Sequence, residues 1–441
     1  MKIVQAAGWY FPDSVGGTEI YVSSLSRALR AAGHDVRIAA PEAGLASPRT
    51  YTHDGFEVFR YPIPRAPSRR EAQGDVAVSG AEHFHRWLSS ARADVVHMHT
   101  FVTGLGLAEI RAARDAGSRV VATTHASSLG FICQRGTLML RGESLCDGRV
   151  DPARCADCAL QHAGAPAFLR STLSALPVPL SRMGGALSGA VGTALGMTDL
   201  IARNMARQRA MLDAVDRFVV LTEHAAAIVR ANGAPAEKIV VNRIGVREEL
   251  EDVAAPAATS ANGPIRIGYV GRFEPVKGVI DLARAMRRIP SHVNLHLEFR
   301  GPAQSPDDLV TRALVSTTCG GDRRVSIDAG VAPQDIVSLL RSYDVICCPS
   351  RCLEGGPTVA LEAIALGVPV IAATVGGAAE ILQDGVNTRL VPPGDVGRLA
   401  AALIEVAGNP GGTICQWRKH LPPARTMADV TREYLALYTH N

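Results

Sequence analysis

Two glutamates, Glu354 and Glu362, flank a glycine pair and the start of an expected helix in the second half of the chain. The segment 349–363 runs Pro-Ser-Arg-Cys-Leu-Glu-Gly-Gly-Pro-Thr-Val-Ala-Leu-Glu-Ala. Gly355 and Gly356 allow backbone amides to approach a ligand closely, and a helix N-terminus attracts an anion. Carboxylates on both sides of an anion site suit a ligand that carries hydroxyls beside a phosphate, as nucleotide sugars do. A glycine-rich turn with two solvated glutamates is the alternative interpretation.

Two cations follow another glycine turn. Arg272 and Lys277 lie within Gly-Tyr-Val-Gly-Arg-Phe-Glu-Pro-Val-Lys-Gly over residues 268–278, between an expected strand and an expected helix. An arginine can bridge phosphate oxygens through two hydrogen bonds, and a lysine adds a point charge. The two segments together predict a binding site for a phosphate-bearing ligand.

The elements that would position these residues are short apolar runs alternating with amphipathic helical patterns. Near-continuous apolar runs are typical of parallel strands that helices cover on both faces. We therefore expect two doubly wound, Rossmann-like α/β domains, with a ligand beyond the carboxyl ends of the strands, in the cleft between the domains. The expected strands span residues 2–7, 36–40, 95–99, 119–124 and 217–221 in the first half, and 265–270, 295–299, 345–348 and 368–372 in the second.

The chain is long enough for two or three domains. The stretch 251–264 is rich in Ala, Pro, Ser and Asn without periodicity, and it is the expected linker. It separates an N-terminal domain (1–250, with an insertion at about 130–160) from a C-terminal domain (265–410). The last stretch, 411–441, is too short for a domain, and its apolar Trp417, Leu435 and Tyr438 would anchor it on the N-domain.

The motifs of the second half resemble those of the family 4 glycosyltransferases, retaining enzymes of the GT-B fold that use nucleotide sugars. The resemblance covers about 265–400 and includes Gly-Arg-x-x-x-x-Lys-Gly (271–278), the glutamate pair, and Gly-Val-Pro-Val-Ile (367–371). Gly-Gly-x-x-Glu-Ile (376–381) and Asp-Gly-x-Asn-x-x-Leu-Val (384–391) match as well. The family's last helix commonly crosses back to the N-domain, in line with the expectation for 411–441. One departure is Gly356-Pro357, where many relatives carry an aromatic residue and then glycine.

This resemblance implies a role for each domain and each residue. The N-terminal domain would be the acceptor-side domain, and the C-terminal domain would be the nucleotide-sugar-binding domain. Arg272 and Lys277 would neutralise the donor diphosphate, Glu354 would face the hydroxyls of the transferred sugar, and Glu362 would hold the ribose hydroxyls. Transfer would proceed by front-face displacement, in which the departing diphosphate helps take the acceptor proton. No catalytic metal is expected, because the cations stabilise the leaving group. Backbone amides around Gly355, Gly356, Thr358 and Val359 would add phosphate contacts.

The first half offers a second set of candidates. Gly16-Gly17 follows the first expected strand, and its amides could cradle a donor phosphate or form a plain turn. The resemblance favours the phosphate, and it implies that His125, at the end of the strand 119–124, lines the cleft beside the donor sugar. For His97 and His99, contact with the acceptor and a structural role are equally open.

Four cysteines, Cys133, Cys146, Cys155 and Cys158, fall within 26 residues of a loop that has little core of its own. A Cys-x-x-Cys pair with two further thiolates satisfies tetrahedral zinc, and metal binding would supply folding energy. We therefore predict a structural zinc site. An iron–sulfur cluster and free or redox-active thiols are the less favoured alternatives. Some family 4 relatives look similar here, with a cysteine-rich insertion after the equivalent histidine.

Composition limits the cellular setting. The chain of 441 residues carries 46 Lys and Arg against 42 Asp and Glu, and only 5% of it is aromatic, so no nucleic-acid partner is expected. Without a recognisable signal peptide, we expect a cytoplasmic protein with reduced thiols. The stretch 163–211, rich in Ala, Leu, Gly, Ser and Arg, is either an amphipathic surface for the cytoplasmic face of a membrane or, as we favour, ordinary helices packed on the N-domain.

The sequence thus predicts a nucleotide-sugar-dependent hexosyltransferase that acts on a hydroxyl of a glycan, a lipid-linked or a small-molecule glycoconjugate acceptor, in cell-wall or polysaccharide biosynthesis. A catalytically silent homologue, binding a nucleotide sugar as scaffold or sensor, is one alternative, and the intact Arg272, Lys277, Glu354 and Glu362 argue against it. An NAD-dependent enzyme is another. The glutamate pair and the absence of a Gly-x-Gly-x-x-Gly fingerprint argue against this second alternative.

Overall fold

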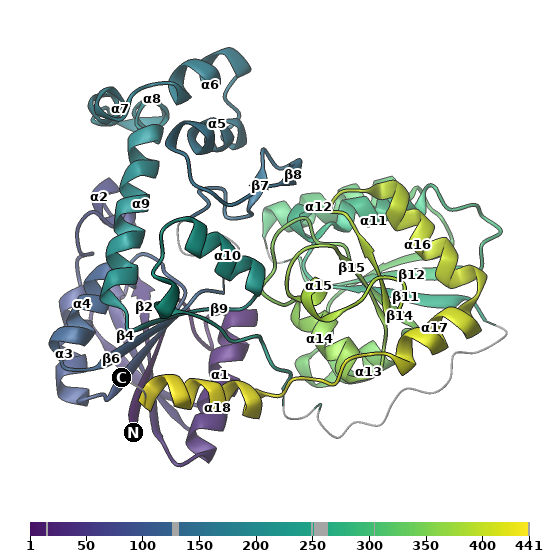
Figure 1. The fold of residues 1–441 in the computed structure, drawn as a ribbon, viewed down its shortest axis with the longest axis horizontal. Coiled ribbons are helices and arrows are strands. Elements are labelled where there is room, and N and C mark those ends of the chain that lie inside the picture. The colour runs from purple at the N-terminus through teal and green to yellow at the C-terminus, as the bar shows by residue number, and fades with distance from the viewer. Residues whose placement is uncertain (15, 126–131, 248–249, 251–262, 304, 440–441) are drawn as a thin grey trace. The chain divides into compact units, whose positions relative to one another are not determined.

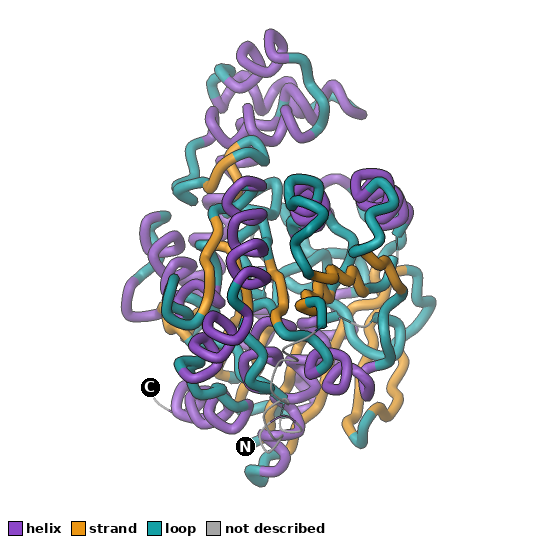
Figure 2. The backbone as a smooth tube through the Cα atoms, turned by 90° about the vertical axis from the view of Figure 1, so that its right-hand side faces the viewer, coloured by secondary structure: helices purple, strands orange, loops and turns teal. Residues whose placement is uncertain are grey.

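The computed structural model describes the chain except residues 15, 126–131, 248–249, 251–262, 304 and 440–441, so most of the expected linker lies outside the described residues. The chain forms two compact units. Unit 1 comprises Met1–Arg141, Cys146–Arg243 and Met427–Asn441, and unit 2 comprises Gly142–Leu145 and Ile244–Thr426. Figure 2, coloured by secondary structure, shows helices packed around the strands of both units.

Unit 1 is built on a sheet with the strand order β10-β9-β6-β5-β1-β2-β4-β3. All neighbouring strands pair in parallel except β3, which runs antiparallel to β4 at one edge. The central strands are almost wholly buried, as expected for a parallel sheet covered on both faces. The strands are β1 (Lys2–Ala7), β2 (Asp35–Ala43), β3 (Arg49–His53), β4 (Phe56–Ile63), β5 (Val95–His99), β6 (Arg119–Thr123), β9 (Arg217–Val220) and β10 (Ile239–Val241).

The helices of unit 1 fall into two groups. Those that alternate with the strands are α1 (Gly17–Ala31), α2 (Arg69–Ala72), α3 (Ala81–Ala91), α4 (Leu107–Asp115) and α10 (Glu223–Ala231). An inserted group follows β6, after the short strands β7 (Met139–Leu140) and β8 (Ser144–Leu145). Its α5 and α9 share a small apolar core of their own. The inserted helices are α5 (Pro152–His162), α6 (Ala167–Ser174), α7 (Val178–Gly185), α8 (Gly189–Leu195) and α9 (Met197–Ala214).

Unit 2 has an all-parallel sheet with the order β13-β12-β11-β14-β15-β16. Its strands are β11 (Ile265–Val270), β12 (Leu295–Arg300), β13 (Val325–Asp328), β14 (Val345–Cys348), β15 (Val370–Ala373) and β16 (Thr388–Val391). The helices are α11 (Val279–Met286), α12 (Pro306–Cys319), α13 (Ile336–Arg341), α14 (Thr358–Ala365), α15 (Gly377–Ile381), α16 (Val396–Gly408) and α17 (Pro410–Lys419). This topology confirms the expected doubly wound α/β class.

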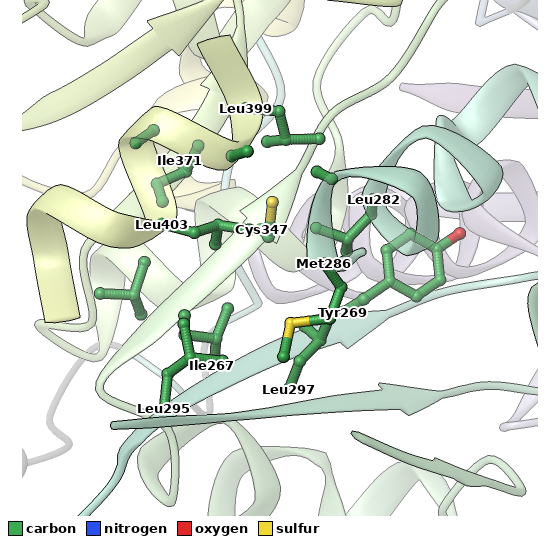
Figure 3. Close-up of a cluster of buried hydrophobic side chains, with 14 of the residues drawn as sticks. Ile267, Tyr269, Leu282, Met286, Leu295, Leu297, Cys347, Ile371, Leu399 and Leu403 are labelled. Carbon is green, nitrogen blue, oxygen red and sulfur yellow. The ribbon is translucent and has the colours of Figure 1, made fainter. Parts of the chain in front are cut away.

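The core of unit 2 shows why these strands and helices assemble. Leu282 and Met286 of α11 and Leu399 and Leu403 of α16 pack on one face of the sheet (Figure 3). The strands supply apolar side chains to the same cluster, from β11, β12, β14 and β15: Ile267, Tyr269, Leu295, Leu297, Cys347 and Ile371. The strands thereby place the loops at their carboxyl ends on a rigid base.

Two expected boundaries are corrected by the packing. Val246 and Leu250 belong to a core cluster of unit 2, so unit 1 ends at Arg243 rather than at residue 250. Trp417 is buried in the unit 2 core, so α17 stays with unit 2. Only α18 (Met427–Thr439) returns to unit 1, where it packs along α1 and buries Tyr434 and Tyr438.

Candidate active site

The two loops that the sequence singled out in unit 2 lie together. The ammonium of Lys277 is 3.0 Å from a carboxylate oxygen of Glu354. Lys277 ends a short 3₁₀ turn after β11, and Glu354 lies in the loop between β14 and α14. Because β11 and β14 are parallel neighbours, their carboxyl ends meet at one edge of the sheet. Burial lowers the pKa of Lys277, but the surrounding acidic groups, led by the carboxylate of Glu354, together more than offset this, so the pKa lies above its ordinary value.

Close backbone packing holds these loops in place. Gly278 has a φ of 73°, and a Cβ there would lie 1.9 Å from the carbonyl oxygen of Pro349, so only glycine fits. Arg351 links the loops further, since its backbone N–H donates to the carbonyl of Val276 at 2.8 Å and its guanidinium pairs with the buried Asp281. The loop that carries Glu354 is therefore a fixed structure and not a solvated turn.

The expected phosphate-binding backbone lies at the start of α14. Thr358 and Val359 occupy the first turn of this helix, where N–H groups have no acceptor within the helix. Gly355 and Gly356 precede it, and both contact the turn that begins α15, because a Cβ on Gly377 would lie 2.4 Å from the carbonyl oxygen of Gly355. The glycine pair thus allows the two loops to pack closely against each other, and it also leaves the backbone open to a ligand.

Glu362 lies on α14 and is almost fully buried. Its carboxylate accepts a hydrogen bond from the Nε of Arg247 at 3.0 Å, and the Nη2 of Arg247 lies 3.0 Å from the same oxygen. Sequence reasoning missed Arg247, because it lies 115 positions away in the chain and next to the expected linker. The pair fixes an ionised carboxylate close to the N-terminal turn of α14.

Arg272 stands apart from the pair of Lys277 and Glu354. Its guanidinium is half exposed and lies 2.9 Å from Glu274. The backbone carbonyl of Arg272 accepts a hydrogen bond from the buried hydroxyl of Tyr269 at 2.6 Å, which fixes the main chain of this loop. The structure therefore places both expected cations after β11. Lys277 pairs with Glu354, whereas Arg272 pairs with Glu274.

In unit 1, the candidate phosphate cradle begins α1. Gly16 is the N-cap of this 15-residue helix, and Gly17 is its first residue. The carboxylate of Glu19 lies in the same turn, where it accepts a hydrogen bond from Ser14 and approaches the position that a Cβ on Gly16 would take. An anion at these amides would therefore face a carboxylate that already offsets part of the helix dipole.

Three histidines form a buried polar network in unit 1. His125 Nε2 lies 3.1 Å from Nδ1 of His99, whose Nε2 in turn lies 2.5 Å from Oε1 of Gln5. His97 lies 2.7 Å from the hydroxyls of both Thr123 and Tyr438. Burial lowers the pKa of His125 to about 4 and the pKa values of His97 and His99 well below their ordinary range, so all three are neutral at pH 7.

The hydrogen bonds of this network fix the position of each histidine ring. His97 and His99 are wholly buried at the end of β5, which favours a structural role over direct acceptor contact. If Gln5 accepts through its oxygen, His99 carries its proton on Nε2, and His125 Nε2–H donates to His99 Nδ1. His125 is thereby held by its neighbour in one orientation.

A pocket that the sequence did not reveal lies at the carboxyl edge of the unit 1 sheet. Its volume is about 410 Å³, and it follows β1 and β2. Trp9 is 55% exposed beside it, and the buried Arg60 pairs with Asp13 at 3.1 Å in its wall. A lone exposed tryptophan and scattered charges gave no periodic signal, so only the fold brings these residues together.

The four cysteines of the insertion line one cavity in unit 1. Within the described residues, however, no three His, Cys, Asp or Glu side chains are gathered as a formed metal-binding group. The predicted zinc site therefore stays a prediction. Near the unit 2 site, Cys347 and Cys352 are buried, and burial raises the pKa of Cys352 to about 12, which makes it unreactive.

Comparison with known proteins agrees with this architecture. The sequence pattern described as "Glycosyl transferase 4-like domain" matches residues 16–245, and "Glycosyl transferases group 1" matches 264–409. Sucrose-phosphate synthase from Thermosynechococcus elongatus superposes with a TM-score of 0.68 at 20% identity, covering 99% of this chain and 98% of that one. HepE from Anabaena, solved with UDP and glucose, superposes with a TM-score of 0.63 at 15% identity over the full length of both chains.

Two parallel α/β units with this topology define the GT-B fold. Because the "Glycosyl transferase 4-like domain" pattern matches more than half of the chain, the protein belongs to that glycosyltransferase family. A curated relative, the D-inositol 3-phosphate glycosyltransferase of Mycobacterium sp. (strain JLS), is 34% identical over 206 residues, or 44% of this chain. The match spans 46% of that relative, slightly under half of its length.

Proposed function

We propose that the protein is a retaining, nucleotide-sugar-dependent glycosyltransferase that acts on a hydroxyl of a glycan, a lipid-linked or a small-molecule glycoconjugate acceptor. A role in cell-wall or polysaccharide biosynthesis follows from that class of acceptor. The observation that carries this proposal is the ion pair of Lys277 and Glu354 at the carboxyl edge of the unit 2 sheet, beside the N-terminus of α14. That arrangement presents a cation, backbone amides and a carboxylate to one ligand.

Unit 2 would bind the donor through these groups. The ammonium of Lys277 and the amides of Thr358 and Val359 would stabilise the negative charge that develops on the departing diphosphate. Arg272 would swing from Glu274 to the same phosphates, since its side chain is half exposed. In this mechanism the diphosphate helps take the acceptor proton, and no catalytic metal is required.

The two glutamates would hold the ends of the donor. Glu362, fixed by Arg247, would accept hydrogen bonds from the ribose hydroxyls. Glu354, fixed by Lys277 and by a hydrogen bond from Ser350, would face the hydroxyls of the sugar that moves. In unit 1, His125 would contact that sugar as a neutral imidazole, and Gly16 and Gly17 would approach a donor phosphate.

The acceptor would bind in the pocket beside Trp9. An exposed indole offers an apolar face to a sugar ring, and the carboxylates of Asp13 and Glu42 in the pocket wall accept hydrogen bonds from hydroxyls. A curated relative is named for D-inositol 3-phosphate, itself a polyhydroxylated ring, which supports this chemical class of acceptor. A raised acceptor KM in Trp9→Ala with an unchanged donor KM would support this placement, whereas an unchanged acceptor KM would refute it.

We also propose that the inserted helices α6–α8, which we call the apolar lobe (Ala167–Leu195), contact a membrane at its cytoplasmic face. Phe168, Met183 and Val191 are 70%, 73% and 66% exposed, and the lobe also exposes Leu169, Leu180 and Leu187. No Asp or Glu occurs between residues 158 and 198. In Figure 1 the lobe lies at the end of α9 that is distant from the sheet of unit 1. Exposed apolar side chains on a segment that carries no Asp or Glu of its own suit insertion into a membrane surface, although Asp157 and Asp199 at its borders pair with Arg170 and Arg182.

Contact with a membrane surface does not require a helix that spans the bilayer. None of the described helices is both long and apolar enough to cross a membrane. The proposed contact is therefore peripheral, through side chains that dip into the headgroup region.

A thermal-shift screen against UDP, GDP, ADP and their sugars tests the proposed function. One nucleotide and its sugars should raise the melting temperature in proportion to RT ln(1 + [L]/Kd). A donor-hydrolysis assay then separates an enzyme from the catalytically silent alternative, which would bind the nucleotide sugar without cleaving it. Absence of a shift with every nucleotide would refute the proposal.

A further inference from the structure

The insertion after β6 encloses a small cavity that the proposed transfer reaction does not use. Its volume is about 30 Å³, and all four cysteines of the segment line it. Cys158 is buried, and Cys133, Cys146 and Cys155 are partly buried. The space holds a single ion or a water molecule and nothing larger.

Three backbone N–H groups point at the sulfur atoms of this cavity. The N–H of Leu138 donates to Cys133 Sγ at 3.4 Å, and that of Arg141 donates to Cys158 Sγ at 3.2 Å. The N–H of Gly148 donates to Cys146 Sγ at 3.4 Å. Three of the four sulfurs thus accept a main-chain hydrogen bond.

The three donor residues share an unusual backbone conformation. Leu138, Arg141 and Gly148 have φ values of 54°, 53° and 71°, in the left-handed region. Residues with a Cβ rarely adopt this region, because the side chain then crowds the backbone. These left-handed residues are the ones that donate to the sulfurs. The strained Leu138 donates to Cys133, and the strained Arg141 donates to Cys158.

Bonds of this kind would be strongest if the sulfurs were thiolates. A neutral thiol sulfur is a weak acceptor, whereas a charged acceptor forms hydrogen bonds of roughly twice the strength. Several thiolates around one small cavity would repel one another without a cation between them. Of the nearby arginines, Arg141 pairs with Asp157 at 2.9 Å and Arg154 with Asp147 at 2.7 Å, while Arg135 and Arg149 also line the cavity.

We propose that Cys133, Cys146, Cys155 and Cys158 bind one zinc ion as thiolates. Four sulfurs satisfy tetrahedral zinc without an open position, which makes the ion structural rather than catalytic. The sulfurs must come closer together to share the ion, since the described residues hold no formed group of three ligands. The backbone N–H groups of Leu138, Arg141 and Gly148 would then stabilise the bound thiolates from outside. The ion would fix a segment whose strands β7 and β8 are only two residues long.

Metal analysis of the full chain, purified under reducing conditions, tests this proposal independently of any sugar donor. We expect about one zinc per chain, and a loss of at least tenfold in bound zinc in Cys155→Ser and Cys158→Ser. Cys415→Ser is the matched control, because Cys415 is exposed on α17 and should keep the full zinc content. A wild-type chain without stoichiometric metal would overturn the proposal, and so would a brown protein that contains iron.

A second measurement covers the case in which a ligand variant fails to fold. Wild-type protein, stripped with a chelator, is titrated with Co²⁺ and followed by absorption. Four thiolates should give intense sulfur-to-cobalt charge-transfer bands that saturate at one equivalent and disappear when zinc is added. Weak bands, saturation at another ratio, or disulfide formation among the four cysteines in place of metal uptake would contradict the assignment.

Discussion

The ammonium of Lys277 and the carboxylate of Glu354 lie 3.0 Å apart, on two loops that are 77 positions apart in the chain. Both side chains are mostly buried, with 31% and 13% of their surface exposed. An ion pair in that setting is strongly coupled, so a change to either residue alters the other. Loss of the Glu354 carboxylate would therefore leave Lys277 without this partner in the donor site.

Glu354→Ala should lower kcat by on the order of 10²-fold, the effect typical of losing one well-placed electrostatic group. The affinity for the free nucleoside diphosphate should not fall, because Lys277 is released to bind phosphate alone. Steady-state kinetics and calorimetric titration of the diphosphate measure the two quantities. Weakened diphosphate binding with an unchanged kcat would show that our orientation of the donor is reversed.

Glu362→Ala should raise the donor KM by about 10- to 100-fold, the range expected for lost hydrogen bonds to a charged group. The fall in kcat should be comparatively small, because ribose contacts are equal in the ground and transition states. Glu362→Gln preserves the volume and shows how much of the effect comes from leaving Arg247 unpaired. A variant that loses only kcat would contradict the ribose assignment.

The residues of the proposed donor and acceptor sites differ in how far the sequence could predict them. Lys277 and Glu354 lie in short segments between strand and helix, and Glu362 lies on the helix that follows, so their spacing in the sequence already predicts the chemistry. Arg247 and the pocket at Trp9 come from chain crossings that no local pattern encodes. The edge strands β13 and β16 were missed because their residues are half polar, and a strand at a sheet edge needs no continuous apolar run.

The C-terminal stretch also shows what a local sequence pattern cannot predict. Trp417, Leu435 and Tyr438 were all expected to anchor on the N-domain, yet Trp417 packs in the unit 2 core. An apolar side chain predicts burial but does not say which core receives it. Tyr434, which the sequence analysis did not name, is the residue whose hydroxyl reaches Tyr21 of α1 at 3.1 Å and Thr123 of β6 at 2.9 Å.

Deletion of residues 427–441 should therefore destabilise unit 1 and lower turnover. The loss removes the buried Val430, Tyr434 and Tyr438 and leaves His97 without its tyrosine partner. Calorimetric melting of the shortened chain measures the effect, with the exposed Arg432→Ala on the same helix as a control that should melt like the wild type. An unchanged melting temperature and full activity in the shortened chain would show that α18 does not support unit 1.

Stability should fall on acidification from about pH 6.5 towards pH 4. Burial lowers the pKa values of His97, His99 and His125 in the folded chain, to about 4 for His125, so the unfolded chain binds protons first. Each histidine then costs up to about 1.4 kcal/mol of unfolding free energy per pH unit in that window. Denaturant titration at pH 7.5, 6 and 5 checks this, and an unfolding free energy that stays level would contradict the neutral histidine network.

Substitution of the apolar lobe should weaken membrane binding without changing stability. Phe168→Ser, Met183→Ser and Val191→Ser combined remove its three most exposed apolar side chains and should cut cosedimentation with phosphatidylglycerol vesicles at least tenfold. The matched control is Leu309→Ser with Val310→Ser on α12, which are 58% and 68% exposed in unit 2. Equal vesicle binding by both variants and the wild type would refute the membrane contact.

Release of nucleoside diphosphate from a panel of UDP-, GDP- and ADP-sugars tests the central claim most directly. The wild-type chain should release the diphosphate of at least one donor. Lys277→Ala should lose this release by on the order of 10²-fold or more. Arg398→Ala, which alters an exposed surface cation, should retain the release. Binding of a nucleotide sugar without any release, or equal release by Lys277→Ala and the wild type, would contradict the assignment of Lys277 and Glu354 to a transferase active site.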